Sequence, residues 1–244
     1  MIIAYAKSDV GKAREMNQDA YYISDSSSDV KLYLLADGMG GYKGGEIASQ
    51  LAIKCTRNYI ENNLKDTPKD RESLLQLIAS SMEYANMVIY EKSKENKELE
   101  GMGTTLEVCL IYNNKAYIGH VGDSRIYRIR KNFMRKLTQD HSYVQKLVKD
   151  GTITKEEAEN HPKKNMLMKA LGCNAFVEPD VSVKGFLRDD ILLIASDGLT
   201  NMVKQEDIFS IATGNIEKAP IRLVELANDN GGLDNITVVV IKNI

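Results

Sequence analysis

Two apolar runs of this chain end in the same way, and this repetition constrains the fold more than any other feature. "YLLADGMGG" (33–41) leads into Asp37 and a glycine, and "LLIASDGLT" (192–200) leads into Asp197 and a glycine. A single Asp-Gly step after an apolar strand is usually only a turn. Its recurrence after two runs so far apart in the chain indicates that the two carboxylates belong to one site.

Two further acids stand at the edges of apolar runs. Asp123 follows "AYIGHVG", and Asp234 precedes "NITVVVI". Carboxylates that gather without partners repel each other, so one or more of them stays protonated unless cations neutralise the group. Acids at four strand edges therefore predict a site that binds cations.

The direction of the strands follows from where two of these acids stand. Asp197 ends its apolar run, whereas Asp234 begins one. In a parallel β-α-β unit these positions would lie at opposite edges of the sheet, and in an antiparallel arrangement they lie at the same edge. A shared site therefore predicts antiparallel strands, despite the helical segment between them.

The residue types near these acids indicate which cation would bind. His120, His141 and His161 are widely spaced and form no i, i+4 pair, which argues against a zinc site. Oxygen ligands alone favour the hard cations Mg²⁺ and Mn²⁺. Gly38 has no Cβ, so its carbonyl oxygen can approach an ion closely, and the glycines of "GMGGYKGG" (38–45) let the chain bend around the site.

The balance of charge argues against nucleic acid as a partner. The 244 residues include 32 Lys and Arg against 34 Asp and Glu, whereas a nucleic-acid-binding protein normally has a basic excess. The most basic segment, "RIYRIRKNFMRKL" (125–137), alternates basic and apolar residues. This pattern favours a hairpin with one solvated basic face over a recognition patch.

Cysteine use and hydropathy predict the compartment. Cys55, Cys109 and Cys173 are scattered among apolar neighbours, as is typical of reduced, buried thiols in a cytosolic protein. The chain shows no signal peptide at its start, and no apolar run approaches the roughly 20 residues that span a bilayer. We expect a cytoplasmic protein without a membrane segment.

The order of the elements predicts one α+β domain over residues 1–244. Strand-like runs open the chain, helical segments follow at 44–64 and 71–96, and strand-like runs then return, before a last helix within 216–230. The apolar residues that recur along the two long helices, and so predict their buried faces, are Ile47, Leu51, Cys55 and Tyr59 in the first, and Leu74, Ile78, Met82, Ala85 and Ile89 in the second.

Two shorter segments also carry predictions. The pair Asn113-Asn114 between strand-like runs predicts a tight hairpin turn. Residues 142–172 are polar and weakly periodic, with short helical patches at 143–151 and 154–160. Because they lie between strands of the core, we expect them to form a flap subdomain beside the site.

With these residues in view, the chain resembles the metal-dependent protein serine/threonine phosphatases of the protein phosphatase 2C family, in their compact bacterial form. The motifs that carry the resemblance are "REMNQDA" (14–20), "LLADGMGG" (34–41), "GMGTTL" (101–106), "GHVGDSR" (119–125), "LTQDHS" (137–142), "ALG" (170–172), "ASDGL" (195–199) and "DNITVVV" (234–240). Each motif is weak alone. Together, in the family's order and almost from end to end, they are specific.

The resemblance implies a fold and a metal site. The fold is a four-layer α-β-β-α sandwich, in which helix pairs flank two central antiparallel sheets. Asp37 would bridge two core ions, Mn²⁺ or Mg²⁺, and the Gly38 carbonyl would bind one of them. Asp197 and Asp234 would complete the other ion's ligands. Asp19 would hold waters that the ions bind.

Two further residues have a functional and a structural interpretation. Asp123, with Asp197, would match the third-metal site of bacterial members, or it caps its own turn. Arg14 would bind the substrate phosphate with its planar guanidinium, or it forms a surface salt bridge. The residues that we assign to structure rather than chemistry are Thr104, Thr105, His120, His141 and Asn235.

The resemblance also implies the reaction, which is hydrolysis of phosphoserine and phosphothreonine in proteins by a water that two metal ions activate. The partners would be phosphorylated proteins, including a bacterial Ser/Thr kinase whose action the enzyme reverses, and we expect a monomer. Many eukaryotic members carry a histidine, their proposed general acid, where this chain has Met39. The general acid is therefore open, and water on the third metal is a candidate.

Two alternatives stand beside this function. One is a phosphatase of the same superfamily dedicated to phosphorylated anti-sigma-factor antagonists, although such enzymes typically follow sensor domains that this chain lacks. The other is a catalytically silent protein that works by binding a partner. The presence of Asp37, Asp197 and Asp234 argues against the silent protein.

Overall fold

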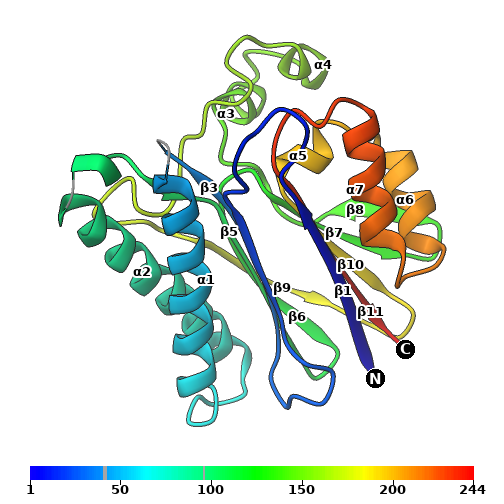
Figure 1. Cartoon of the computed structure of the whole chain (residues 1–244). Helices are drawn as coiled ribbons and strands as arrows, with labels where there is room; N and C mark the ends of the chain where they lie inside the picture. The colour runs from blue at the N-terminus through cyan, green and yellow to red at the C-terminus, as the bar shows by residue number, and fades with distance from the viewer. Residues whose placement is uncertain (41–42, 96) are drawn as a thin grey trace.

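The computed structural model describes residues 1–40, 43–95 and 97–244, and the strands in them form two antiparallel sheets that pack face to face (Figure 1). One sheet has the order β1-β11-β10-β7-β8. Its strands are β1 (Ile2–Asp9), β7 (Arg125–Arg130), β8 (Phe133–Lys136), β10 (Ile191–Ala195) and β11 (Ile236–Asn243). The other has the order β2-β3-β5-β6-β9, and β4 pairs with the end of β3. Its strands are β2 (Asp19–Ile23), β3 (Lys31–Met39), β4 (Gly103–Thr104), β5 (Leu106–Tyr112), β6 (Lys115–Val121) and β9 (Asp180–Gly185).

Helices cover the outer faces of both sheets (Figure 1). The long helices α1 (Gly44–Asn63) and α2 (Arg71–Glu95) pack on the sheet that contains β3, and α6 (Gln205–Thr213) and α7 (Ala219–Asp229) pack on the sheet that contains β11. The shorter helices are η1 (Lys97–Leu99), α3 (Tyr143–Lys149), α4 (Lys155–Glu159) and α5 (Asp197–Thr200). The predicted four-layer α-β-β-α sandwich is confirmed.

Strand β3 is buried on both faces, which explains why its sequence is apolar without interruption. Leu34 belongs to the core under α1 and α2, whereas its neighbour Leu35 belongs to the core between the two sheets. Both side chains are fully buried. A strand that is covered on both faces has no polar face, and each fully buried leucine contributes about 1.5–3 kcal/mol.

The hairpin turn predicted at 113–114 is present between β5 and β6. Asn113 and Asn114 have φ angles of 47° and 56°, so both central residues adopt the left-handed conformation that a two-residue hairpin of this hand requires. The turn sets the register of the pair, with Tyr112 opposite Lys115.

The strands that carry the second Asp-Gly step and Asp234 are antiparallel, as the sequence required. Ala195 at the end of β10 pairs with Val238 near the start of β11. Because the chain returns through α5, α6 and α7 and then runs in the opposite direction, Asp197 and Asp234 lie at the same edge of the sheet.

The basic segment 125–137 forms the predicted hairpin, but its basic face is not simply solvated. Arg125 pairs with Asp140 at 2.8 Å, and Arg130 pairs with Asp190 at 2.6 Å. Strand β7 is an inner strand between β10 and β8, so its arginines are partly covered and need acceptors. The expectation of one solvated basic face holds for Lys131 and Arg135, which are exposed, but not for Arg125 and Arg130, which are paired with carboxylates.

The helix predictions were right in position and partly wrong in detail. In α1 the fully buried residues are smaller and lie one position further on, at Ala48, Ala52, Thr56 and Ile60, while the predicted apolar residues pack beside this core. Small side chains let the helix approach the sheet closely. The predicted face of α2 is confirmed. The sequence analysis did not identify α6.

The cysteines are unpaired, in agreement with the prediction, but they are not all buried. Cys109 is buried and Cys55 is half-buried, whereas Cys173 is exposed. Cys173 follows the segment 142–172, where the chain runs over the edge of the sheets rather than through the core.

The segment 142–172 contains α3 and α4, which correspond to the two predicted helical patches. Figure 1 shows these helices standing beyond the upper edge of the sheets. The segment returns to the sandwich where Leu171 bridges to Thr104. Of the glycine-rich loop at 38–45, residues 41–42 lie outside the described part of the chain.

Candidate functional site

Five carboxylates gather at one edge of the sandwich, and we call them the acid cluster: Asp19, Asp37, Asp123, Asp197 and Asp234. Asp19 and Asp37 face each other across β2 and β3. Asp197 begins α5, Asp234 comes just before β11, and Asp123 lies in the turn between β6 and β7. All five are half-buried. The structure therefore brings together every acid that the sequence singled out.

The backbone of Asp37, near the end of β3, is held by hydrogen bonds to Thr104 and Thr105. The Asp37 N–H donates to the Thr105 hydroxyl at 2.9 Å, and its carbonyl oxygen accepts from the Thr105 N–H at 2.9 Å and from the Thr104 hydroxyl at 2.9 Å. The Thr105 hydroxyl also bonds the Ser124 hydroxyl at 2.9 Å, beside Asp123. Thr105 thus joins the strand of Asp37 to the turn of Asp123.

The glycine of each Asp-Gly step is required by close backbone packing. A Cβ on Gly38 would lie 2.1 Å from the carbonyl oxygen of Gly45, and a Cβ on Gly198 would lie 2.0 Å from that of Asn235. Neither position admits any side chain. The repeated Asp-Gly step therefore combines a carboxylate for the cluster with a glycine that lets the next segment approach it.

Asp19 has an incomplete set of partners, whereas Asp197 is bonded by a neighbouring amide. The Ser196 hydroxyl donates to Asp19 Oδ2 at 2.9 Å, whereas the buried Oδ1 of Asp19 has no partner among the described residues. Asn201 donates to Asp197 Oδ2 at 3.1 Å. A buried carboxylate oxygen without a donor is costly, and it points to a water or ion as its missing partner.

Arg14 reaches the cluster from the loop that follows β1. Its guanidinium donates to Asp234 Oδ2 at 2.8 Å. Asn235 holds this loop in place, because its amide group donates to the carbonyl oxygens of Val10 and Met16 and accepts from the Gln18 N–H. Arg14 thus forms a surface salt bridge, as its structural interpretation predicted. It also lies beside the acid cluster, as a role in binding the substrate phosphate requires.

The electrostatics of the cluster are those of crowded like charges. Burial, followed by repulsion from Asp19 and the other acids, raises the pKa of Asp37 well above its usual range. Burial and neighbouring acids raise the pKa of Asp19 to about 7 and that of Asp123 to about 7. Arg14 is the cation that bonds an acid of the cluster directly, and it is half exposed.

The donor set fits hard divalent cations in its chemistry. It consists of carboxylate and backbone oxygens, Asp19 Oδ1 has no partner among the described residues, and the acids repel one another until a cation joins them. In the described residues no three His, Cys, Asp or Glu side chains are already closed around a point.

A second polar group lies between the sheets, and the sequence analysis missed it. The Glu107 carboxyl and the His120 ring form a hydrogen-bonded pair with Glu107 Oε1 2.5 Å from Nδ1, and His120 Nε2 donates to the Gln139 carbonyl at 2.8 Å. Burial raises the pKa of Glu107 to about 7. The register of the hairpin at 113–114 could have found this pair, because it places Glu107 opposite His120.

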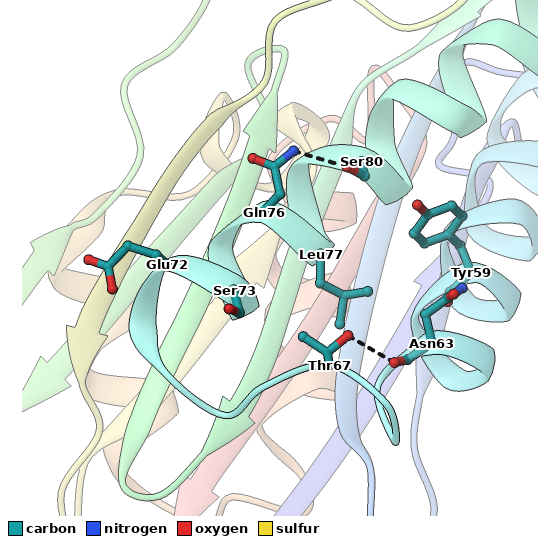
Figure 2. Close-up of a pocket in the computed structure, with 8 residues that line it drawn as sticks. All are labelled: Tyr59, Asn63, Thr67, Glu72, Ser73, Gln76, Leu77 and Ser80. Carbon is teal, nitrogen blue, oxygen red and sulfur yellow. Dashed lines mark hydrogen bonds between the residues drawn. The ribbon is translucent and has the colours of Figure 1, made fainter.

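A surface hollow of about 490 Å³ lies at the far end of the helix pair and contains none of the predicted site residues (Figure 2). Its polar groups bond each other, since Gln76 donates to Ser80 and Thr67 donates to the Asn63 carbonyl. The residues that line it are Tyr59, Asn63, Thr67, Glu72, Ser73, Gln76, Leu77 and Ser80. This lining contains a single carboxylate, Glu72, and so offers no chemistry comparable to that of the acid cluster.

The sequence of this chain is similar to a known family of proteins over most of its length. The family model described as Protein phosphatase 2C matches residues 11–217. Protein phosphatase PhpP of Streptococcus pneumoniae is 39% identical over 236 residues, which cover 96% of this chain and 94% of that protein.

In the described part of the chain, no helix has the length and apolar character needed to cross a membrane.

Solved structures agree over the whole chain. The serine/threonine phosphatase of S. agalactiae superposes with a TM-score of 0.90 at 36% identity and covers 100% of both chains. The catalytic domain of the serine/threonine protein phosphatase PstP, solved in complex with 2 manganese ions, superposes with a TM-score of 0.86 at 36% identity and covers 99% of this chain and 97% of that one. That relative binds manganese on the same fold.

Proposed function

The chain belongs to the protein phosphatase 2C family, and we propose that it hydrolyses phosphoserine and phosphothreonine in proteins with the help of Mn²⁺ or Mg²⁺. The observation that carries the proposal is the acid cluster itself. Its carboxylates crowd together at the end of β3 and β10, and burial, followed by repulsion from the other four acids, raises the pKa of Asp37. Such an arrangement is costly for a structural role and is suited to binding cations.

Each acid has a proposed role in holding the ions. Asp37 and the Gly38 carbonyl would bind at the centre of the cluster, with Asp197 and Asp234 completing the two-ion site. Asp123, beside Asp197, would help to hold a third. Bound ions would lower the pKa of a water that they bind and would neutralise charge on the phosphate.

The remaining side chains act on water and phosphate. Asp19 accepts a hydrogen bond from a water at its Oδ1 and orients that water, while Ser196 holds Oδ2 in place. Arg14 donates its N–H groups to phosphate oxygens and stabilises the charge that develops on them. The Met39 thioether has no proton to donate, so the departing serine or threonine oxygen takes its proton from water.

The surroundings of the site suggest its partners. We propose that residues 1–244 act as one phosphatase domain, a monomer, in which the flap at 142–172 controls which phosphorylated proteins reach the acid cluster. A Ser/Thr kinase would supply these substrates. We place the protein in the cytoplasm, because its three cysteines are unpaired.

Turnover of a phosphoserine peptide tests the function. We expect turnover with Mn²⁺ or Mg²⁺ and its loss in excess chelator, with recovery when metal is restored. Full turnover in the chelator would contradict metal-dependent catalysis. Binding of the phosphopeptide without turnover under any metal would favour the catalytically silent alternative.

A further inference from the structure

The flap joins the sandwich through a short paired neck. The Tyr143 N–H donates to the Met166 carbonyl at 2.8 Å, the Met168 N–H donates to the His141 carbonyl at 2.7 Å, and Ser142 bridges to Leu167 between them. The chain that enters the flap and the chain that leaves it are therefore held side by side. Whatever holds this neck also sets where the flap stands.

One residue of the neck, His141, is bound to the turn that carries Asp123. The His141 N–H donates to the Gly122 carbonyl at 2.7 Å, and the Gly122 N–H donates back to His141 Nδ1 at 3.1 Å. Because Nδ1 accepts a hydrogen bond, the ring proton lies on Nε2, which is 3.2 Å from Asp180 Oδ2. The imidazole thus bridges the β6–β7 turn and the start of β9.

The surroundings of His141 keep this tautomer in place. The His120 ring packs against it with centroids 4.5 Å apart, and the side chain is only 13% exposed. Burial, followed by the charges of His120 and Lys169, lowers the pKa of His141 to about 4. The ring is therefore neutral at physiological pH, and Nδ1 remains an acceptor.

The turn that receives these bonds has little freedom of its own. Gly122 has a φ of 118° and lies directly over Thr105, where a Cβ would meet the threonine side chain at 2.5 Å. Ser124 is bonded to the same threonine. Asp123 stands between these two fixed residues, so a shift of Gly122 changes the position of its carboxylate.

We propose that His141 is a positioning residue that locks the neck of the flap to the Gly122–Asp123 turn, so that the flap and Asp123 keep one relative placement during catalysis. Its catalytic consequence rests on the proposed phosphatase function. The geometric part, the bond from the Gly122 N–H to Nδ1, stands independently of that function. His141 itself touches no reacting atom.

Two amide substitutions separate the two bonds of the ring. His141→Asn places an oxygen where Nδ1 was and keeps an acceptor for the Gly122 N–H. His141→Gln instead extends toward the position of Nε2 and loses that acceptor. His141→Ala removes both, and His161→Ala, which removes another histidine of the flap, is the matched control.

Hydrogen exchange of the Gly122 amide, followed by NMR, is the direct measurement. Losing one hydrogen bond should accelerate exchange by about tenfold in His141→Ala and His141→Gln, and by less than about twofold in His141→Asn and His161→Ala. Turnover of a phosphoserine peptide should fall by about tenfold in the same two variants and be retained in the Asn variant. Unchanged exchange in His141→Ala, or equal behaviour of Asn and Gln, would overturn the proposal.

Asp180→Ala provides a second, independent test. It removes the partner of Nε2 and leaves the Gly122 bond intact, so both Gly122 exchange and turnover should stay near the unmodified values. A loss as large as that of His141→Ala would mean that β9, not the Asp123 turn, is the relevant attachment. If the unmodified protein has no phosphatase activity but the exchange pattern holds, the proposed function fails while the assignment of His141 survives.

Discussion

Carboxylates are buried or half-buried in two regions of this molecule, and the two regions differ in how far side chains of the chain itself compensate them. Between and beside the sheets, Asp140 is bonded to Arg125 and Asp190 to Arg130, and Glu107 is bonded to His120 through Oε1, although its Oε2 has no partner among the described residues. We call these the paired carboxylates. In the acid cluster, the direct arginine contact that the described residues make to the five carboxylates comes from the half-exposed Arg14.

The difference teaches how to recognise a functional site. Burial raises the pKa of a carboxyl group in both regions, as Glu107 and Asp37 show. What separates the regions is compensation, because a buried charge with a partner contributes to structure and a group of like charges without partners costs stability. The acid cluster is therefore the part of the molecule whose chemistry requires something from outside the chain.

The largest expected effect is on turnover, from Asp37→Asn. We expect phosphopeptide turnover to fall by at least about 10³-fold, because the central carboxylate of the cluster is lost. Stability to urea in chelator should not fall, since the change removes one of several repelling charges. A large loss of stability together with activity would mean that the cluster is structural, and would break the comparison.

The opposite pattern is expected for Asp190→Ala among the paired carboxylates. Asp190 is 2% exposed and accepts two bonds from Arg130, at 2.7 and 2.6 Å, and one from the Leu187 N–H. Its removal should lower the free energy of unfolding by about 2–4 kcal/mol, because the Leu187 N–H loses its acceptor and Arg130 keeps the Gly185 carbonyl but loses both carboxylate bonds. Turnover per folded molecule should be unchanged. Asp190→Asn, which keeps an acceptor for Leu187, should lose less.

A smaller effect, the dependence of stability on pH, should sharpen the comparison. The folded pKa of Asp19 and of Asp123 is about 7, above the ordinary value of 3.8, so the folded state holds protons that the unfolded chain releases. In chelator the free energy of unfolding should therefore fall as pH rises from about 4 to about 7, at up to roughly 1.4 kcal/mol per unit for each group.

Saturating Mn²⁺ should reverse the sign of this slope, because the ion binds the deprotonated carboxylates and its affinity rises with pH. Urea titrations between pH 4 and pH 8, with Mn²⁺ and with chelator, measure the difference. Glu107→Gln is the matched control, since it removes a raised pKa among the paired carboxylates and should leave the metal-dependent part unchanged. A pH dependence of the free energy of unfolding that is the same with Mn²⁺ and with chelator would argue against metal binding at the acid cluster.

Much of this arrangement could be predicted from the sequence, because strand ends and direction are local properties. Asp197 at the end of one strand and Asp234 at the start of another required antiparallel neighbours, and β10 and β11 are antiparallel. The same logic would have paired Glu107 with His120, since a two-residue turn at 113–114 fixes which residues face each other.

Other features depend on packing that no local pattern records. The buried residues of α1 are small ones such as Ala48 and Ala52, chosen by how closely the helix approaches the sheet. The helix α6 buries only Ile208 and Ala212, too few for a clear periodic signal, although the acids of its first turn and Gly214 after its end were usable signals. The bond between Arg14 and Asp234 joins segments 220 positions apart.

The smallest expected effect concerns that bond, the direct ion pair between the acid cluster and a described arginine. The side chains of Arg14 and Asp234 are 54% and 38% exposed, and an ion pair so exposed contributes at most about 1 kcal/mol. Arg14→Ala should therefore change stability in chelator by less than that amount. It should also tighten Mn²⁺ binding by about twofold to fivefold, because Asp234 no longer exchanges a partner when the ion binds. Calorimetric titration with Mn²⁺ measures this, and Arg14→Lys, which keeps the charge but not the planar fork, is the control. Weaker Mn²⁺ binding in Arg14→Ala would show that the arginine organises the ligands rather than competing for one of them. The acid cluster would then be compensated by its arginine, as the paired carboxylates are, and the contrast between the two regions would fail.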